Sequence, residues 1–279
     1  MQEKLRFLSL SSSSDGNCFY LGTESGGILI DAGIGVRKIL STLADNNIDI
    51  ESIRALFVTH DHIDHTRAVC SLSERRGVPL YATAKTIEAI NRSSLTPKLT
   101  SNTNIIEKQQ SITIGDMVVT PFELLHDAFD CVGYSIEAFG KRFTLMTDLG
   151  CITQTVSHYI SISNYLVIES NYDRDMLAAN TNYPYILKQR IDGNYGHLCN
   201  EQTAQALCEN FHNDLKHIWL CHISRDNNTP QLALKTICDS LCGCNVEIEP
   251  LERCNPSPLF LLGFWIITNQ PVANRYTLT

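Results

Sequence analysis

The sequence predicts an α/β fold in which two β-sheets pack face to face and helices cover the outside. Predicted strands dominate the first part of the chain, and strands and helices alternate in the second part. This order is typical of packed sheets with helices on their outer faces. Four metal-ligand residues also follow predicted strands, so we expect four dispersed strand ends to meet at one edge; they are His60, His126, Asp148 and His222.

Composition indicates one globular unit. Of the 279 residues, 43% are hydrophobic and 19% are charged, which favours a packed core over disorder. We expect a single domain over residues 1–262 and a tail of unknown role at 263–279. The net charge of −8 gives no basic field that would recruit nucleic acid.

The cysteines and the apolar runs bear on the cellular compartment. The 11 cysteines are unevenly spaced and follow no secretory signal, so we expect reduced thiols and a cytoplasmic location. The apolar run at 259–267 is too short to span a bilayer, and no membrane partner is expected.

Apolar runs and turn residues predict the elements of the first half in order. The opening strand is expected at 6–10, and the polar stretch SSSSDGN at 11–17 is expected to be a loop. Residues 92–110 are polar and predict no element. The other expected strands are 18–21, 27–30, 55–58, 79–82 and 117–125, and the expected helices are 36–44, a segment from 68, and 85–91.

The second half opens with a predicted hairpin, in which 133–138 and 142–146 are joined by a turn at 139–141. Short apolar runs then alternate with stretches of helical periodicity. The expected strands are 165–169, 217–221 and 246–248, and the expected helices are 173–179, 184–191, 201–211 and 231–241.

A dense group of metal-ligand side chains follows the expected strand at 55–58. It contains His60, His62, Asp64 and His65. Residues two apart in an extended chain point the same way, so His60 and His62 can face one metal. Asp64 and His65 begin the next turn and point toward a second position. A lone histidine is more often structural, but four ligand-type residues in this order favour a site for divalent ions.

Three further candidates stand at the ends of later strands: His126, Asp148 and His222. Taken singly, each is more often a hydrogen-bonded residue or a cap at a strand end. Their order behind residues 60–65 is what favours a shared site.

The pattern His-x-His-x-Asp-His at 60–65 resembles the signature of the metallo-β-lactamase superfamily. The resemblance implies a two-metal hydrolase on an αββα sandwich. It implies that His60, His62 and His126 hold one metal, that Asp64, His65 and His222 hold the other, and that Asp148 bridges them. An aspartate offers two oxygens for this purpose, and metals about 3.5–4 Å apart suit phosphoryl chemistry.

Six stretches narrow the resemblance: SSSSDGN (11–17), DAG (31–33), HDAFDCVGY (126–134), TDLG (147–150), GHLCN (196–200) and HISRDNN (222–228). They look like the YycJ/WalJ family of exonucleases with the metallo-β-lactamase fold. Members usually have Ser at Cys199 and Pro at Cys131, and neither position is a ligand. The resemblance implies a 5′-to-3′ exonuclease with DNA as its substrate and two divalent ions, Zn, Mn or Fe, as its cofactors.

Candidate catalytic and substrate-binding residues follow from this interpretation. Asp64 and Asp148 are expected to serve catalysis at the metals. His197 lies just before an expected helix, where a histidine bonded to its own loop is the alternative. Its segment resembles a motif of ribonuclease Z relatives, which implies that it binds the scissile phosphate or protonates the leaving 3′-oxygen. The candidate substrate-binding residues are Ser12, Asn17, Lys188, Arg190, His197, Arg225 and Asn228.

Two other function classes stay open on sequence alone. A small-molecule hydrolase acting on a cyclic phosphodiester or a thioester agrees with the acidic charge. A non-catalytic metal-binding protein is disfavoured by the complete ligand set. The native metal, the choice between DNA and RNA, the strand polarity and the oligomeric state are not determined by the sequence.

Overall fold

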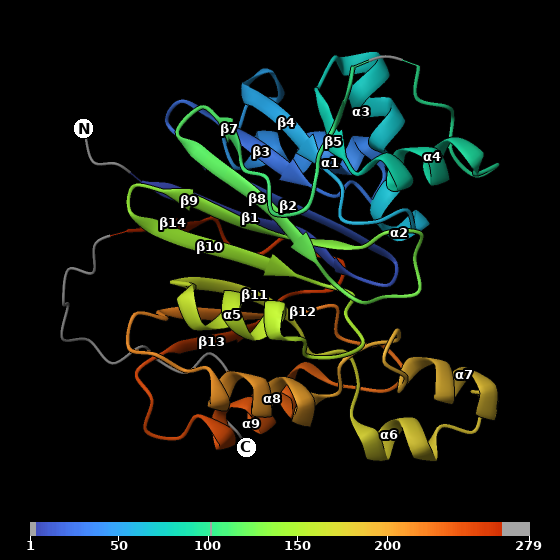
Figure 1. The fold of residues 1–279 in the computed structure, drawn as a ribbon, viewed down its shortest axis with the longest axis vertical. Coiled ribbons are helices and arrows are strands. Elements are labelled where there is room, and N and C mark those ends of the chain that lie inside the picture. The colour runs from blue at the N-terminus through green and yellow to red at the C-terminus, as the bar shows by residue number, and fades with distance from the viewer. Residues whose placement is uncertain (1–3, 101, 264–279) are drawn as a thin grey trace.

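Two β-sheets form the centre of the computed structural model, which describes residues 4–100 and 102–263 (Figure 1). Within those residues each sheet has seven strands. The first has the order β14-β1-β2-β3-β4-β5-β6. Its strands are β1 (Leu5–Ser13), β2 (Gly16–Thr23), β3 (Gly26–Ile30), β4 (Ile53–Phe57), β5 (Leu80–Ala82), β6 (Thr103–Ile105) and β14 (Phe260–Leu262).

The second sheet has the order β13-β12-β11-β10-β9-β8-β7. Most of its strands were predicted, and the bounds of β11 and β12 match the predicted ranges. Its strands are β7 (Ile112–Ile114), β8 (Met117–Glu123), β9 (Val132–Ala138), β10 (Lys141–Met146), β11 (Tyr165–Glu169), β12 (His217–Cys221) and β13 (Glu247–Pro250).

Helices cover both outer faces. The helices on the side of the first sheet are α1 (Val36–Asp45), α3 (Val69–Arg76) and α4 (Ala84–Arg92) (Figure 1). Those on the side of the second sheet are α5 (Gln154–Ile162), α8 (Asn200–Glu209) and α9 (Pro230–Ser240) (Figure 1). The short helices are η1 (Ile50–Ser52), α2 (Ile63–Thr66), α6 (Arg174–Ala179) and α7 (Tyr185–Ile191). The predicted αββα sandwich is therefore confirmed.

The strand alternation explains the layers. Along β1, Phe7 belongs to the core between the sheets, and Leu8 belongs to the core under the outer helices, because neighbouring side chains point to opposite faces. Aromatic rings fill the central layer: Phe7 lies 4.7 Å from Trp219, measured between ring centroids. Tyr134 also donates a hydrogen bond across the sandwich to the carbonyl of Val58, at 2.6 Å.

Strand direction brings the candidate residues together. β3, β4 and β5 run parallel in the first sheet, and β10, β11 and β12 run parallel in the second. β8 and β10 both run antiparallel to β9, so β8 shares their direction. The carboxyl ends of these strands therefore meet at one edge, where functional loops gather in open α/β sheets.

The polar stretch SSSSDGN is not a loop, contrary to the prediction. β1 continues to Ser13 and β2 begins at Gly16, with only a turn between them. The serine hydroxyls have partners, so their burial is tolerated; for example, Ser11 donates to the carbonyl of Arg253 at 2.7 Å. The edge strands β6, β7 and β14 and helix α5 were not predicted.

Among the described residues no helix combines the length and the hydropathy that a bilayer span requires. A single domain over 1–262 stays a prediction. The predicted tail at 263–279 lies outside the described residues, apart from Gly263.

Candidate active site

The candidate active site lies where the loops after β4, β8, β10, β11 and β12 converge. The sequence folds this way because each of these strands is largely buried and leads into a loop with polar residues. The segment after β4 comes from the first sheet, and the other four come from the second. Both sheets therefore contribute to one site.

Three histidines form the first half of the site. Nitrogen atoms of His60, His62 and His126 all lie within 4.8 Å of one another. The ring centroid of His60 lies 4.6 Å from that of His62 and 5.2 Å from that of His126. The structure thus brings together the three residues that the family resemblance assigns to one metal.

The second half of the site contains Asp64, His65 and His222, whose ligand atoms also lie within 4.8 Å of one another. His65 and His222 are buried, and Asp64 is partly exposed. The Oδ2 atom of Asp64 lies 3.5 Å from Nε2 of His65 and 3.8 Å from Nε2 of His222. These are the three residues predicted for the other metal.

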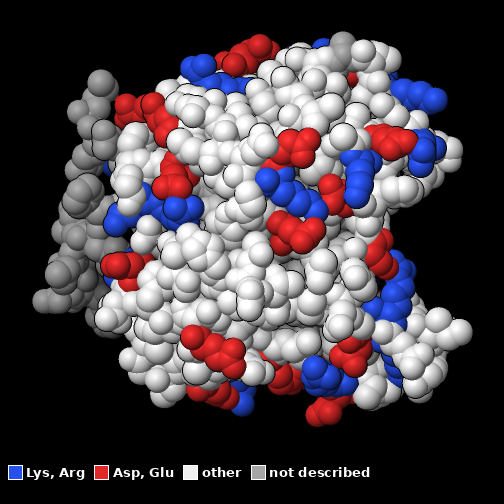
Figure 2. Space-filling view, viewed as in Figure 1, with Lys and Arg blue, Asp and Glu red and all other residues white. Residues whose placement is uncertain are grey.

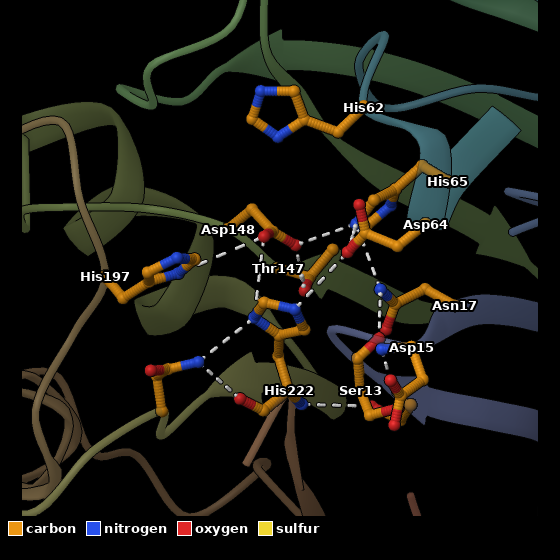
Figure 3. Close-up of polar contacts among 12 residues, drawn as sticks. Ser13, Asp15, Asn17, His62, Asp64, His65, Thr147, Asp148, His197 and His222 are labelled. Atoms are coloured by element: carbon orange, nitrogen blue, oxygen red, sulfur yellow. Dashed lines mark hydrogen bonds and ion pairs between the residues drawn. The ribbon is translucent and has the colours of Figure 1, made fainter. Parts of the chain in front are cut away.

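Asp148 lies between His62 of the first half and the residues of the second half (Figure 3). Its Oδ2 is 3.2 Å from Nε2 of His65, and its Oδ1 is 3.8 Å from Nε2 of His126 and 3.4 Å from Nδ1 of His222. Burial raises the pKa of this carboxyl, but the charges of His222 and His65 outweigh that effect and hold the pKa well below its usual range. Asp148 is therefore a buried carboxylate whose oxygens approach histidines of both halves.

Neighbouring side chains or carbonyls contact Nδ1 of four histidines, which leaves Nε2 of each ring directed into the site. His65 donates from Nδ1 to Asp31 at 2.7 Å, and His222 donates to Glu169 at 2.8 Å. His126 donates to the carbonyl of Gly196 at 2.9 Å, and Nδ1 of His60 lies 3.0 Å from the hydroxyl of Thr59. Outer partners of this kind orient ligating histidines in metal sites.

The backbone is strained at three of these positions. Asp31, Asp148 and His222 have φ values of 60°, 56° and 52°, in the left-handed region that non-glycine residues seldom adopt. Such conformations persist where surrounding contacts enforce them, and they concentrate at functional sites.

The donor set fits divalent cations. Nε2 of His60 and Nε2 of His222 are buried and have no hydrogen-bond partner among the described residues. Burial lowers the pKa of His60, so this ring is a neutral nitrogen donor. Although burial lowers the pKa of His222, Asp148 and two further carboxylates raise it to about 10. The second half thus attracts positive charge, and its nitrogen and oxygen atoms suit Zn, Mn or Fe.

His197 lies beside this cluster, on the loop before α8. Its Nδ1 is 2.8 Å from Oε1 of Glu169 and 3.9 Å from Oδ1 of Asp148. Glu169 also accepts the backbone N–H of Leu198 at 3.0 Å. Burial raises the pKa of Glu169, but His197 and His222 outweigh it and lower the pKa below its usual value. The side chain of His197 is 21% exposed, so it is not sealed in the interior as Glu169 is.

The predicted substrate-binding residues fall into two groups. Ser12, Asn17 and Asn228 are buried, and their contacts are internal: the Ser12 hydroxyl accepts the N–H of His222 at 3.0 Å, and Asn228 bonds to Ser170, Asn171 and Asn200. Asn17 donates to the carbonyl of Ser13 and lies 3.0 Å from His65. Their side chains thus have internal partners, and a role in substrate binding stays a prediction for these three residues.

The second group is basic, and it contains two exposed residues, Arg190 and Arg225, and the partly exposed Lys188. Lys188 donates to the carbonyl of Ala178 at 2.6 Å, and Arg190 forms an ion pair with Asp127. Arg225 is exposed and has no ion pair within the described part of the chain. A role in phosphate binding stays a prediction for these three residues.

Sequence reasoning missed the carboxylates behind the histidines. Asp31 and Glu169 both lie at strand ends and are fully buried. A buried charged residue needs a charged or hydrogen-bonded partner, so an acidic residue directly after an apolar strand was the available signal. Only the spatial neighbours identify those partners as His65, His197 and His222.

Comparisons with known proteins agree with this geometry. A family model described as the Beta-lactamase superfamily domain matches residues 27–219. The exodeoxyribonuclease WalJ from Streptococcus pneumoniae is 34% identical over 244 residues, which cover 87% of this chain and 90% of the relative. The exodeoxyribonuclease YycJ from Bacillus anthracis is 32% identical over 234 residues, which cover 84% and 88%.

Solved structures share the fold at low identity. The metallo-β-lactamase fold protein YhfI from Bacillus subtilis has a TM-score of 0.70 at 15% identity and covers 92% of this chain and 99% of its own. Zn²⁺-bound PqqB from Methylobacterium extorquens has a TM-score of 0.67 at 16% identity and covers 90% and 99%. From its sequence and its fold, the chain belongs to the metallo-β-lactamase superfamily and, within it, to the WalJ/YycJ family.

Proposed function

We propose that this protein is a metal-dependent phosphodiesterase that degrades DNA as an exonuclease from 5′ to 3′. The observation that carries the proposal is the position of Asp148, a buried carboxylate between two clusters of metal-ligand side chains. Both curated relatives are named exodeoxyribonucleases, which favours this activity over a small-molecule hydrolase.

We assign the ligands as two sets that share one carboxylate. His60, His62 and His126 would hold one divalent ion, Asp64, His65 and His222 the other, and Asp148 both. When bound, such ions supply positive charge for the phosphoryl oxygens and make water more acidic. Their identity, Zn, Mn or Fe, is part of the proposal, as is their number.

The protein's own residues would hold the strand and move the proton. Glu169 fixes Nδ1 of His197, so Nε2 is the nitrogen that is left for a substrate. From there His197 can bind the scissile phosphate or give a proton to the leaving 3′-oxygen, the role that histidine commonly takes near neutral pH. Arg190 and Arg225 are candidates for neighbouring phosphates because a guanidinium matches phosphate bidentately.

The test is digestion of single- and double-stranded DNA labelled at the 5′ or the 3′ end, with Zn, Mn or Fe added. We expect mononucleotides from the 5′ end and no product after chelation. A matched control substitutes Asp148→Asn in the same preparation. Turnover of bis-p-nitrophenyl phosphate or cyclic phosphodiesters with no cleavage of DNA would overturn the proposal.

A further inference from the structure

Exposed apolar side chains gather beside the candidate active site. Among the described residues, seven large hydrophobic side chains are prominently exposed, and four of them belong to the loops and the helix around the site. Phe129 is 60% exposed, Tyr195 59%, Tyr185 73% and Ile186 80%. Monomeric proteins tolerate scattered exposed apolar residues, but a local group rimmed by polar residues indicates a binding surface.

The backbones of Phe129 and Tyr195 are tied to the site. The N–H of Phe129 donates to Oδ1 of Asp61, between His60 and His62, at 3.1 Å. Tyr195 precedes Gly196, whose carbonyl accepts from His126. The same segment packs on Gly150, where an added Cβ would come 2.4 Å from the carbonyl of Asn194. The backbone of each residue is therefore held in place, while its aromatic ring is exposed to solvent.

Helix α7 carries the other two side chains. Ile186 and Arg190 are four residues apart and share one face of the helix. Arg190 pairs with Asp127, so this face turns toward the loop that holds Phe129. Tyr185 is held by Gln189, which donates to its hydroxyl at 2.9 Å. The molecular outline is hollowed between the parts that carry α4 and α7 (Figure 2).

Charge supplies little of the affinity for a polyanion here. The chain has a net charge of −8, Arg190 is paired with Asp127, and Lys188 donates to a carbonyl. A nucleic acid offers one other large surface, the flat faces of its bases, and stacking on aromatic rings tolerates any sequence.

We propose that Phe129 and Tyr195, extended by Tyr185 and Ile186 on α7, stack against unpaired bases of the strand that is being cut. This inference rests on the proposed function and specifies its substrate: a single strand, an overhang or a frayed end. A blunt duplex hides the base faces within its own stack, so it must open before these rings can hold it.

The experiment measures the affinity of the metal-loaded protein for a fluorescent, cleavage-resistant phosphorothioate strand by anisotropy. Phe129→Ala and Tyr195→Ala should each weaken binding by about 5- to 100-fold, the usual worth of one stacked base. Leu261→Ala is the matched control, because Leu261 is 61% exposed on β14, at the outer edge of the first sheet. It should bind like the unsubstituted protein.

A second strand carries abasic residues in place of the bases. It should bind the unsubstituted protein more weakly than the normal strand does, and the double variant should not distinguish the two strands. Loss of cleavage should be larger for a normal DNA strand than for the abasic strand, which keeps the phosphates and has no bases to stack. Unchanged affinity in both variants, or equal losses for the normal and the abasic strand, would overturn the stacking proposal. If the unsubstituted protein cleaves no DNA, the proposed function itself fails.

Discussion

Nδ1 of His197 donates to Oε1 of Glu169 at 2.8 Å. The same oxygen accepts from Nδ1 of His222, also at 2.8 Å. One buried carboxylate therefore positions the proposed proton donor and a proposed metal ligand together. Any change at Glu169 should alter both functions.

We predict that Glu169→Gln lowers both metal affinity and turnover by about 10- to 100-fold, the usual effect of removing a partner behind a ligating histidine. The glutamine amide has the shape of the glutamate carboxylate but no negative charge. It therefore no longer favours a proton on Nδ1 of both His197 and His222. Metal titration and DNA digestion measure the two effects. Glu209→Gln, at an exposed position on α8, is the control, and full metal affinity in Glu169→Gln would contradict the shared role.

For His197→Ala we expect a rate about 10²–10⁴-fold lower, the usual contribution of an acid–base group. The metal content should stay that of the unsubstituted protein, because the two ligand sets are complete without this residue. Digestion rates and elemental analysis on one preparation provide the comparison. Loss of metal along with activity would instead make His197 a ligand.

Asp148→Ala should abolish hydrolysis and lower the occupancy of at least one metal. The carboxylate offsets the charge of two cations that lie close together, and alanine leaves them uncompensated. Elemental analysis after reconstitution measures the occupancy, with Asp226→Ala, an exposed position, as control. A variant that keeps two metals and most of its activity would refute the bridging role.

A pH effect is expected at the far end of β12. His217 is buried between Glu247 and Glu249, with its two ring nitrogens 3.1 Å from their carboxylates, and it stacks on Trp219. Burial lowers the pKa of His217, but the two glutamates outweigh it and raise the pKa above its usual value. Its stabilisation is therefore complete below about pH 6.5 and is lost as the pH rises through the higher folded pKa.

The measurement is urea unfolding of the unsubstituted protein and of His217→Gln at pH 6 and pH 9. The difference in the free energy of unfolding should be larger at pH 6. His158→Gln, at an exposed position, should show no such trend. An equal difference at both pH values would mean that His217 is not charged in the folded protein.

The long buried strands were predictable because their signal is local. β11 and β12 are continuous apolar runs between polar residues, and their predicted bounds are confirmed. β6, β7 and β14 have three residues each and lie at sheet edges. Such short strands contain too few residues to show the alternation of apolar and polar residues that predicts a strand. Helix α5 is rich in β-branched residues, which are poor helix formers, and its N-cap Thr153 was the remaining signal.

The convergence of the candidate ligands was predictable for a similar reason. Each follows a strand, and parallel strands end at one edge. The partners behind them were not predictable, because Glu169 meets His197 and His222 only through the order of strands in the sheet. The ion pair of Arg190 was not predictable for the same reason. Its position in the sequence indicates a basic residue at a helix end, whereas its pairing with Asp127 depends on how α7 packs against a loop 63 residues away.

The division of the site between the two sheets has a consequence for a chain that is still being synthesised. The segment at 60–65 emerges early, but His222 follows β12, and β14 must return to pair with β1 before the first sheet is complete. A nascent chain therefore carries a partial ligand set through most of its translation. The proposed site can therefore be completed only late in synthesis, after β12 and the residue that follows it have been made.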